Sequence, residues 1–560
     1  MAHRDFGALS PFELKDELIK LAQSNSDKMM LNAGRGNPNF LALDPREAFF
    51  ALGRFALRES RRTFAHMPEG VGGFPKREGL GDRFEAFARE EKEDSGAQLL
   101  KAAVSYVRDQ LGIHSDDFLG ELCEASLACS YPVPDRMLKV CEKICARYLR
   151  KEMVGNHPFA EKFDLYAVEG GTAAMTYLFN SLRENHILKA GDSIALALPI
   201  FTPYIEIPKL DDYGLVEVGI NADPAKGWQF SDEEIDKLRD PKVKAFFLVN
   251  PSNPPSVKID DRTLQRIGQI AKERPDLVIL TDDVYGTFAD NFTSLFAVAP
   301  RNTILVYSYS KHFGATGWRL GLVALCEDNV IDAAIAKLPQ AQKDRLHERY
   351  ESITTEPDKL KFIDRLVADS RTVALNHTAG LSTPQQAQMA LFSLFALMDE
   401  KDAYKHAVKG LVRRRKAALR SAMGLTPEKD PGRNSVDYYH ILDLEVTGGE
   451  LYGKGFVEWF KKEVPASEAL FRLAKESAVV MLPGRGFGAL HPSARVSLAN
   501  LTEPDYEKIG SAAKTLMDDY HRRYMQSPAG KAQAERDGAP DSAAIGEGRH
   551  SAAQQKAWKD

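Results

Sequence analysis

The sequence predicts an α/β fold with an open β-sheet. Two apolar runs, residues 245–248 and 277–280, are typical of short buried strands, and each leads into polar side chains. Ligands of open α/β sheets bind beyond the carboxyl ends of the strands. We therefore expect Asn253, Asp282 and Tyr285, which follow these strands, to meet in one crevice.

A third strand-like run, residues 165–168, precedes a glycine-rich turn at Gly170, Gly171 and Thr172 that opens into a helical pattern. Free backbone N–H groups at such a helix start can hold a phosphate. An ordinary strand-to-helix turn is the alternative. Arg319 favours the phosphate interpretation, because a guanidinium is a natural second clamp on a phosphate dianion.

Lys311 stands in the segment Ser308-Tyr309-Ser310-Lys311, shortly before Arg319. A lysine among small and polar residues suits Schiff-base chemistry with a carbonyl compound. An isolated lysine is usually a solvated surface charge. The expected convergence of Lys311 with Asn253 and Asp282 favours a chemical role.

These motifs, together with Arg495, resemble those of the fold-type I enzymes that are similar to aspartate aminotransferase and use pyridoxal 5'-phosphate. The resemblance covers about residues 30–510, with the motifs in the family's order. It implies the α/β architecture of that fold type: a large domain with a mostly parallel seven-stranded sheet flanked by helices, and a smaller α+β domain.

The resemblance also implies roles for individual residues. Lys311 is implied to form a Schiff base with the cofactor aldehyde, and Asp282 to pair with the ring nitrogen and keep it protonated. Phe201 is implied to stack on the pyridine ring, although a core phenylalanine is the alternative. The other implied cofactor contacts are Asn253 and Tyr285 at the phenolic oxygen, and Gly170, Gly171, Thr172, Ser308 and Arg319 at the phosphate.

Three arginines are expected at the substrate end. The resemblance implies that Arg495 makes a two-pronged pair with the substrate α-carboxylate. Arg35, within Gly34-Arg35-Gly36-Asn37-Pro38, and Arg485 are additional cations in matching segments. They suggest a substrate with a second carboxylate, whereas surface salt bridges are the alternative for both.

The chain is longer than a simple family member, and the excess has a helical pattern. Leu100, Val104, Val107 and Leu111 mark one amphipathic helix, and Leu360, Ile363, Leu366 and Val367 mark another. We predict five parts: a segment over the active site (1–45), a helical insertion (46–130), a large cofactor-binding domain (131–395) with a second insertion at about 335–375, a small domain (396–526) and a disordered tail (527–560).

The two insertions, Arg35 and the segment that begins at Tyr131 together resemble a narrower group, the aspartate 4-decarboxylases. This implies conversion of L-aspartate to L-alanine and carbon dioxide, with aspartate transamination as a side reaction. The catalytic motifs alone fit an aminotransferase equally well. Tyr131 is implied to enter the phosphate site of a partner subunit, so we expect a homo-oligomer, at least a dimer and up to a dodecamer of dimers.

Composition excludes several other classes. A net charge of -5 gives no reason to expect nucleic-acid binding, and the basic run at 413–416 is interpreted as a solvated helix face. Cys141 and Cys145 share a helix face without a suitably spaced histidine, so no metal site is expected. Neither a signal peptide nor a membrane span is apparent, which predicts a cytoplasmic protein. A cofactor-binding transcription regulator is disfavoured, because a DNA-binding domain has no room before Asn32.

Overall fold

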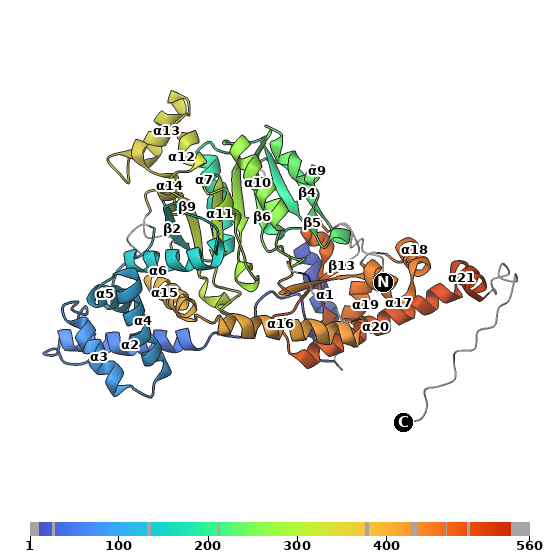
Figure 1. Cartoon of the computed structure of the whole chain (residues 1–560), viewed down its shortest axis with the longest axis horizontal. Helices are drawn as coiled ribbons and strands as arrows, with labels where there is room; N and C mark the ends of the chain where they lie inside the picture. The colour runs from blue at the N-terminus through green and yellow to red at the C-terminus, as the bar shows by residue number, and fades with distance from the viewer. Residues whose placement is uncertain are drawn as a thin grey trace, which may run out of the picture.

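The fold is described from a computed structural model (Figure 1). The structure describes residues 11–24, 28–131, 136–210, 213–375, 380–426, 432, 434–465, 467–489 and 493–538.

The central sheet has the strand order β2-β9-β8-β7-β6-β3-β4-β5. Strand β9 runs antiparallel to both of its neighbours, and the two-residue β5 pairs antiparallel with β4 at the edge. The remaining neighbours are parallel, which confirms the predicted α/β fold; β5 extends the expected seven strands by one. The strands are β2 (Phe163–Val168), β3 (Ser193–Leu198), β4 (Val216–Asp223), β5 (Gln229–Phe230), β6 (Val243–Val249), β7 (Val278–Asp282), β8 (Thr303–Ser308) and β9 (Gly321–Cys326).

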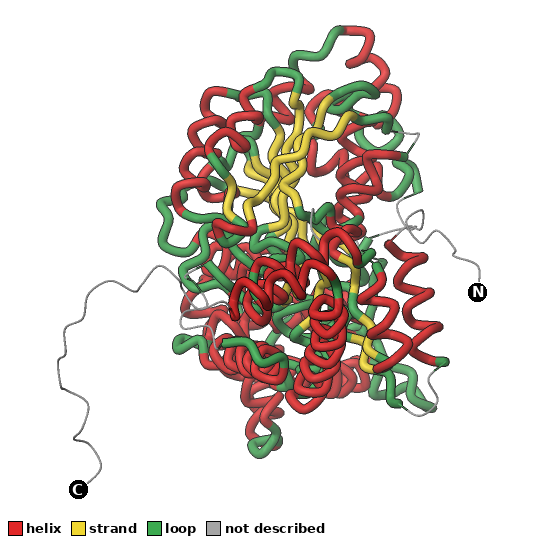
Figure 2. The backbone as a smooth tube through the Cα atoms, turned by 90° about the vertical axis from the view of Figure 1, so that its right-hand side faces the viewer, coloured by secondary structure: helices red, strands yellow, loops and turns green. Residues whose placement is uncertain are grey.

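Helices cover both faces of the sheet (Figure 2). Successive residues of β6 point to opposite faces, so Phe247 joins the core on one side and Phe246 the core on the other. This explains why the strands are continuously apolar. One side carries α6 (Lys139–Leu149), α7 (Gly171–Glu184), α14 (Phe362–Ser370) and α15 (Thr383–Met398), and the other α9 (Asp232–Asp236), α10 (Asp261–Glu273) and α11 (Leu295–Val298).

The first predicted helical insertion, residues 46–130, forms a cluster of helices next to the central sheet and its covering helices (Figure 1). The predicted stripe lies on α4, where Leu100, Val104 and Val107 are buried and Leu111 is half-buried. Phe55 of α2 packs on Phe84 of α3 in the same core. The helices are α2 (Asp44–Thr63), α3 (Leu80–Glu90), α4 (Ser95–Leu111) and α5 (Ser115–Ser126).

The second predicted helical insertion packs against β2 and α7 of the central sheet layer. Ile363, Leu366 and Val367 of α14 are buried, as the stripe predicts, and α14 contacts α7. The buried carboxylate of Asp369 accepts hydrogen bonds from Ser181 of α7 and from Arg349. The helices before α14 are α12 (Val330–Ile335) and α13 (Gln340–Tyr350). The predicted division into domains stays a prediction.

A second core joins the two ends of the chain. The N-terminal β1 pairs in parallel with β11, and a three-stranded sheet has the order β10-β13-β12. The elements are α1 (Pro11–Gln23), β1 (Leu31–Asn32), α16 (Ala403–Ala422), β10 (Tyr439–Asp443), α17 (Leu444–Tyr452), α18 (Lys454–Glu463), α19 (Glu468–Ser477), β11 (Val479–Val480), β12 (Leu482–Pro483), β13 (Ser493–Ser497) and α20 (Glu503–Gln526).

Two expectations differ from the structure. The tail was expected to be disordered from residue 527, but α21 (Pro528–Gly538) follows α20, and the rest of that prediction lies outside the described residues. Ser527 accepts a hydrogen bond from the Gly530 N–H, and proline is favourable in a first helical turn. In the basic run, Arg415 is buried and donates to the Leu498 carbonyl, so the run is not wholly solvated.

Within the described part of the chain, no helix has the length and apolar character needed to cross a membrane.

Candidate active site

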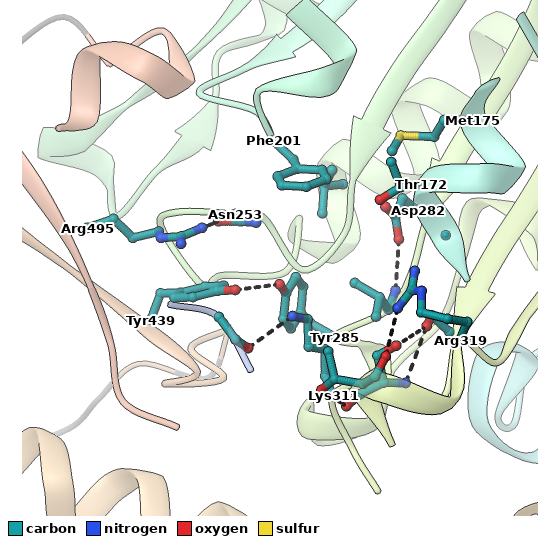
Figure 3. A pocket seen from close by; sticks show the side chains of 17 residues that line it. Thr172, Met175, Phe201, Asn253, Asp282, Tyr285, Lys311, Arg319, Tyr439 and Arg495 are labelled. Carbon is teal, nitrogen blue, oxygen red and sulfur yellow. Dashed lines mark hydrogen bonds between the residues drawn. The ribbon is translucent and has the colours of Figure 1, made fainter. Parts of the chain in front are cut away.

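A cavity of about 200 Å³ lies beyond the carboxyl ends of β6, β7 and β8 (Figure 3). Backbone hydrogen bonds keep these ends together, since the Asn250 N–H donates to the Asp282 carbonyl and the Asp283 N–H donates to the Val306 carbonyl. The structure brings together ten of the residues that the sequence nominated: Gly171, Thr172, Phe201, Asn253, Asp282, Tyr285, Ser308, Lys311, Arg319 and Arg495.

The amine of Lys311 points into the cavity and donates to the Gly36 carbonyl, with the two atoms 2.9 Å apart. Burial lowers the pKa of Lys311; the cations Arg495 and Arg319 act in the same direction, whereas Tyr439 and Asp282 oppose it. A lowered pKa leaves more of the lysine as a neutral amine, which is the form that attacks a carbonyl or accepts a proton.

Asp282, the last residue of β7, is buried on the cavity floor. Burial raises its pKa to about 6, against hydrogen bonds from the Val284 N–H and from the hydroxyl of Tyr204, whose distances are 3.2 and 3.4 Å. A carboxyl in this position gains a partner when a protonated heterocyclic nitrogen binds beside it.

Two buried tyrosines meet in the cavity wall. The hydroxyl oxygens of Tyr285 and Tyr439 are 2.9 Å apart, and either group can be the donor. Burial raises the pKa of Tyr285 well above its ordinary value. Tyr285 and Asn253 therefore offer neutral hydrogen-bonding groups to a phenolic oxygen.

The structure contains a cradle that suits a phosphate. Helix α7 begins at Gly171 without a side-chain cap, which leaves its first N–H groups for a ligand. Gly170 has φ 86°, and a Cβ there would lie 2.2 Å from Nη2 of Arg319. The glycine thus lets Arg319 approach the helix start, with Ser308 also on the cavity wall. Backbone donors, hydroxyls and a guanidinium fit a phosphate dianion.

Arg495 of β13 lies at the opposite end of the cavity. It is 4% exposed, and it donates to Oδ1 of Asn253 at 3.1 Å and to the Gly34 carbonyl at 2.7 Å. Its guanidinium stacks on the rings of Tyr439 and Phe487. Its buried Nε has no partner among the described residues, so a bound carboxylate can satisfy this donor.

Four nominated residues do not line the cavity. Gly170 lies behind it against Arg319. Tyr131 is 68% exposed, and Arg35 is exposed next to Gly36. Arg485 is exposed in a separate groove with Glu206 and Glu217. The roles of these residues stay predictions.

Several contributors to the site were not nominated from the sequence, among them Tyr439, Gly36 and Tyr204. Tyr439 and the backbone of Gly36 line the cavity, and Tyr204 bonds Asp282 from behind. Tyr204 lies in the short helix α8 (Pro203–Glu206), three residues after Phe201, and a single tyrosine there forms no recognisable motif. Tyr439 has no local signal, because its partners Tyr285 and Arg495 are remote in sequence.

Comparison with known proteins agrees with this geometry. The family profile "Aminotransferase class I and II" matches residues 142–512. The chain is 57% identical over 523 residues to the bifunctional aspartate aminotransferase and L-aspartate beta-decarboxylase of a Pseudomonas species, covering 93% of this chain and 98% of that protein. The chain belongs to the class I and II aminotransferase family, and its cofactor is pyridoxal 5'-phosphate, as predicted.

Solved structures support the fold. A Thermus thermophilus aspartate aminotransferase double mutant has a TM-score of 0.57 at 18% identity, covering 91% of this chain and 96% of that one. An aromatic aminotransferase from Pyrococcus horikoshii has a TM-score of 0.52 at 19% identity, covering 90% and 99%.

Proposed function

We propose that this protein is a pyridoxal phosphate-dependent aspartate 4-decarboxylase that also transaminates aspartate. The observation that carries the proposal is the 57% identity to a bifunctional relative along 98% of that relative's length. The cavity adds a chemical reason, since it combines a lysine of lowered pKa with a phosphate cradle and a buried arginine.

The cavity residues fit the cofactor. When bound, pyridoxal phosphate draws electrons away from the carbon atoms of an attached amino acid. The N–H groups of Gly171 and Thr172, with Ser308 and Arg319, would hold its phosphate. Asp282 would pair with the ring nitrogen, and Asn253 and Tyr285 would bond the phenolic oxygen.

At the substrate end, the fork of Arg495 binds the α-carboxylate and so fixes the orientation of the α-carbon. The amine of Lys311 removes the α-proton and returns a proton later in the cycle. Its contact with the Gly36 carbonyl holds the amine between Asp282 and Arg495, where both reactions of aspartate need a base.

Decarboxylation and transamination differ in which bond of aspartate is broken. Decarboxylation breaks the bond between the β-carbon and its carboxylate, and the β-carbon then needs a proton. Transamination leaves that bond intact and needs water at the α-carbon. A cation that binds the β-carboxylate must orient it without resisting its departure. Arg35 and Arg485 stay the predicted candidates, and substitution of Arg485 tests this role.

Assembly and location belong to the same proposal. The side chain of Tyr131 is exposed on this chain, as the predicted contact with a second subunit requires, and this supports a homo-oligomer of at least a dimer, with a dodecamer of dimers as the predicted upper size. The protein acts in the cytoplasm. Sedimentation of the purified protein with its cofactor measures the assembly.

The deciding experiment supplies purified protein with its cofactor and L-aspartate, but without a keto-acid acceptor. The proposal expects continuous release of alanine and carbon dioxide over many turnovers. An aminotransferase would stop after one turnover with oxaloacetate as the product, and this outcome would replace the decarboxylase assignment. Addition of 2-oxoglutarate to the same sample measures the transamination activity.

A further inference from the structure

Tyr439 occupies a position that the proposed cofactor and substrate contacts do not explain. It lies in β10, diagonally across the strand pair from Arg495, and its ring is 4.3 Å from that guanidinium. Its side chain points into the cavity toward Tyr285 (Figure 3). Tyr439 is thus a cavity hydroxyl on the small-domain side, opposite the strands that carry the cofactor contacts.

Gly36 makes room for this hydroxyl. A Cβ on Gly36 would lie 2.5 Å from the Tyr439 hydroxyl and 3.3 Å from Nζ of Lys311. The phenol and the amine therefore both lie close to Gly36, and a side chain at position 36 would displace the hydroxyl. Tyr439 and Lys311 are thus two proton-carrying groups that line the same cavity.

The electrostatic setting makes Tyr439 unusual among the buried tyrosines. Burial by itself raises its pKa, but the cations Lys311 and Arg495 and the hydrogen bond with Tyr285 outweigh burial, so the pKa of Tyr439 is lowered. Asp282 opposes this effect. By contrast, burial raises the pKa of Tyr285 and of Tyr438 well above the ordinary value. Tyr439 is therefore the strongest acid among Tyr285, Tyr438 and Tyr439.

Decarboxylation requires an acid that transamination does not. Loss of carbon dioxide leaves an electron pair to be quenched by a proton at the β-carbon. Lys311 is the proposed base for the α-proton, Tyr285 would face the cofactor oxygen, and Tyr204 bonds Asp282. Of the two tyrosines in the described cavity lining, Tyr439 is the one with no such assignment.

We propose that Tyr439 is the catalytic acid that protonates the β-carbon after carbon dioxide departs. This inference rests on the proposed function. The bond between the β-carbon and the carboxylate breaks, its electron pair stays with the substrate, and the phenol proton forms the new C–H bond. Water then returns a proton to the phenolate, which accounts for the proton consumed when aspartate becomes alanine.

The test is Tyr439→Phe in the holoenzyme, with alanine and oxaloacetate measured from the same aspartate reaction. Alanine formation is expected to fall roughly 100-fold or more, the usual contribution of a positioned acid. Oxaloacetate formation in the presence of 2-oxoglutarate is expected to change by less than about fivefold, because transamination needs no proton at the β-carbon.

Tyr438→Phe is the matched control. It removes a hydroxyl from the adjacent residue, which donates to the Gly36 carbonyl and is not part of the cavity lining. This control is expected to keep the wild-type ratio of alanine to oxaloacetate. An equal change of ratio in both variants would contradict the proposal.

A second readout uses the cofactor-free protein. The tyrosinate absorbance is titrated with pH in wild type and in Tyr439→Phe, and the difference is expected to show one phenol that ionises below ordinary tyrosine. The proposal is overturned if no such phenol is lost, if alanine and oxaloacetate formation fall together, or if the variant no longer retains the cofactor. A wild type that fails to release alanine would instead refute the proposed function.

Discussion

The two ends of the cavity are built in different ways. At the proposed cofactor end, Asp282 and Ser308 are the last residues of the adjacent strands β7 and β8, and Gly171 is the first residue of α7, which follows β2. At the substrate end, Arg495 bonds the carbonyl of Gly34, which is 461 residues away in sequence. The cofactor end is a product of one sheet, whereas the substrate end depends on contacts between the two extremes of the chain.

This difference indicates which property each end of the cavity controls. The sheet positions the proposed cofactor contacts through short loops, so they depend on local sequence. The substrate contacts use backbone carbonyls of residues 34 and 36, which hold Arg495 and Lys311 in place. We expect substitutions at the first end to change cofactor chemistry and those at the second to change substrate binding.

The largest effect at the cofactor end is expected from Asp282→Asn. Loss of the buried carboxylate removes the charge that faces the ring nitrogen, so kcat should fall about 10³-fold with the cofactor at saturation, while KM for aspartate changes little. Steady-state kinetics measure both constants. Asp283→Asn is the control, because the pKa of this buried neighbour is raised to about 7 by burial and it does not line the cavity. A similar loss in both variants would refute the distinction.

Arg495→Lys tests the substrate end. Lysine keeps the charge but loses the fork, so kcat/KM for aspartate should fall roughly 100-fold, mainly through KM, with cofactor affinity unchanged. Weaker cofactor binding would show that the two ends are not separable. Arg485→Ala is the companion variant: impaired aspartate turnover is expected, and unchanged kinetics would remove Arg485 from the substrate site.

The smallest effect is expected from Gly170→Ala. The new Cβ would meet Nη2 of Arg319, and the backbone has a positive φ, so the Kd of the cofactor should rise about tenfold. Gly227→Ala is the matched control, since this glycine also has a positive φ but its Cβ would meet no described atom within 4 Å. Fluorescence titration of the cofactor-free protein measures both. Equal affinities in the two variants would contradict the packing argument.

The same contrast between the two ends explains which parts of the fold and of the site could be predicted from the sequence. The strand ends, the glycine turn, Lys311 and Arg319 could be located because each stands in a short pattern with a local physical cause. The fold class followed from these strands and from the resemblance that they support. Arg495 was found through the resemblance alone, because nothing in its neighbourhood indicates that it reaches Asn253.

Other features could not be predicted, mostly because they depend on packing between segments that are distant in the sequence. Tyr439 gains its importance from Arg495, Tyr285 and Lys311, none of which is near it in sequence. Arg415 looked like a surface charge until Asn39 and the Leu498 carbonyl supplied partners for it. Helix α21 was missed because its weakly apolar composition outweighed the favourable start at Ser527 and Pro528.

The parallel pairing of β1 with β11 has a consequence for biosynthesis. Leu31 and Asn32 leave the ribosome before the strands of the central sheet, yet their partners Val479 and Val480 emerge only after all of those strands. Domains generally fold during synthesis from the N-terminus onward. The nascent chain can therefore assemble the central sheet first, and the segment of Gly34 and Gly36 reaches its place beside Arg495 only after β1 pairs with β11.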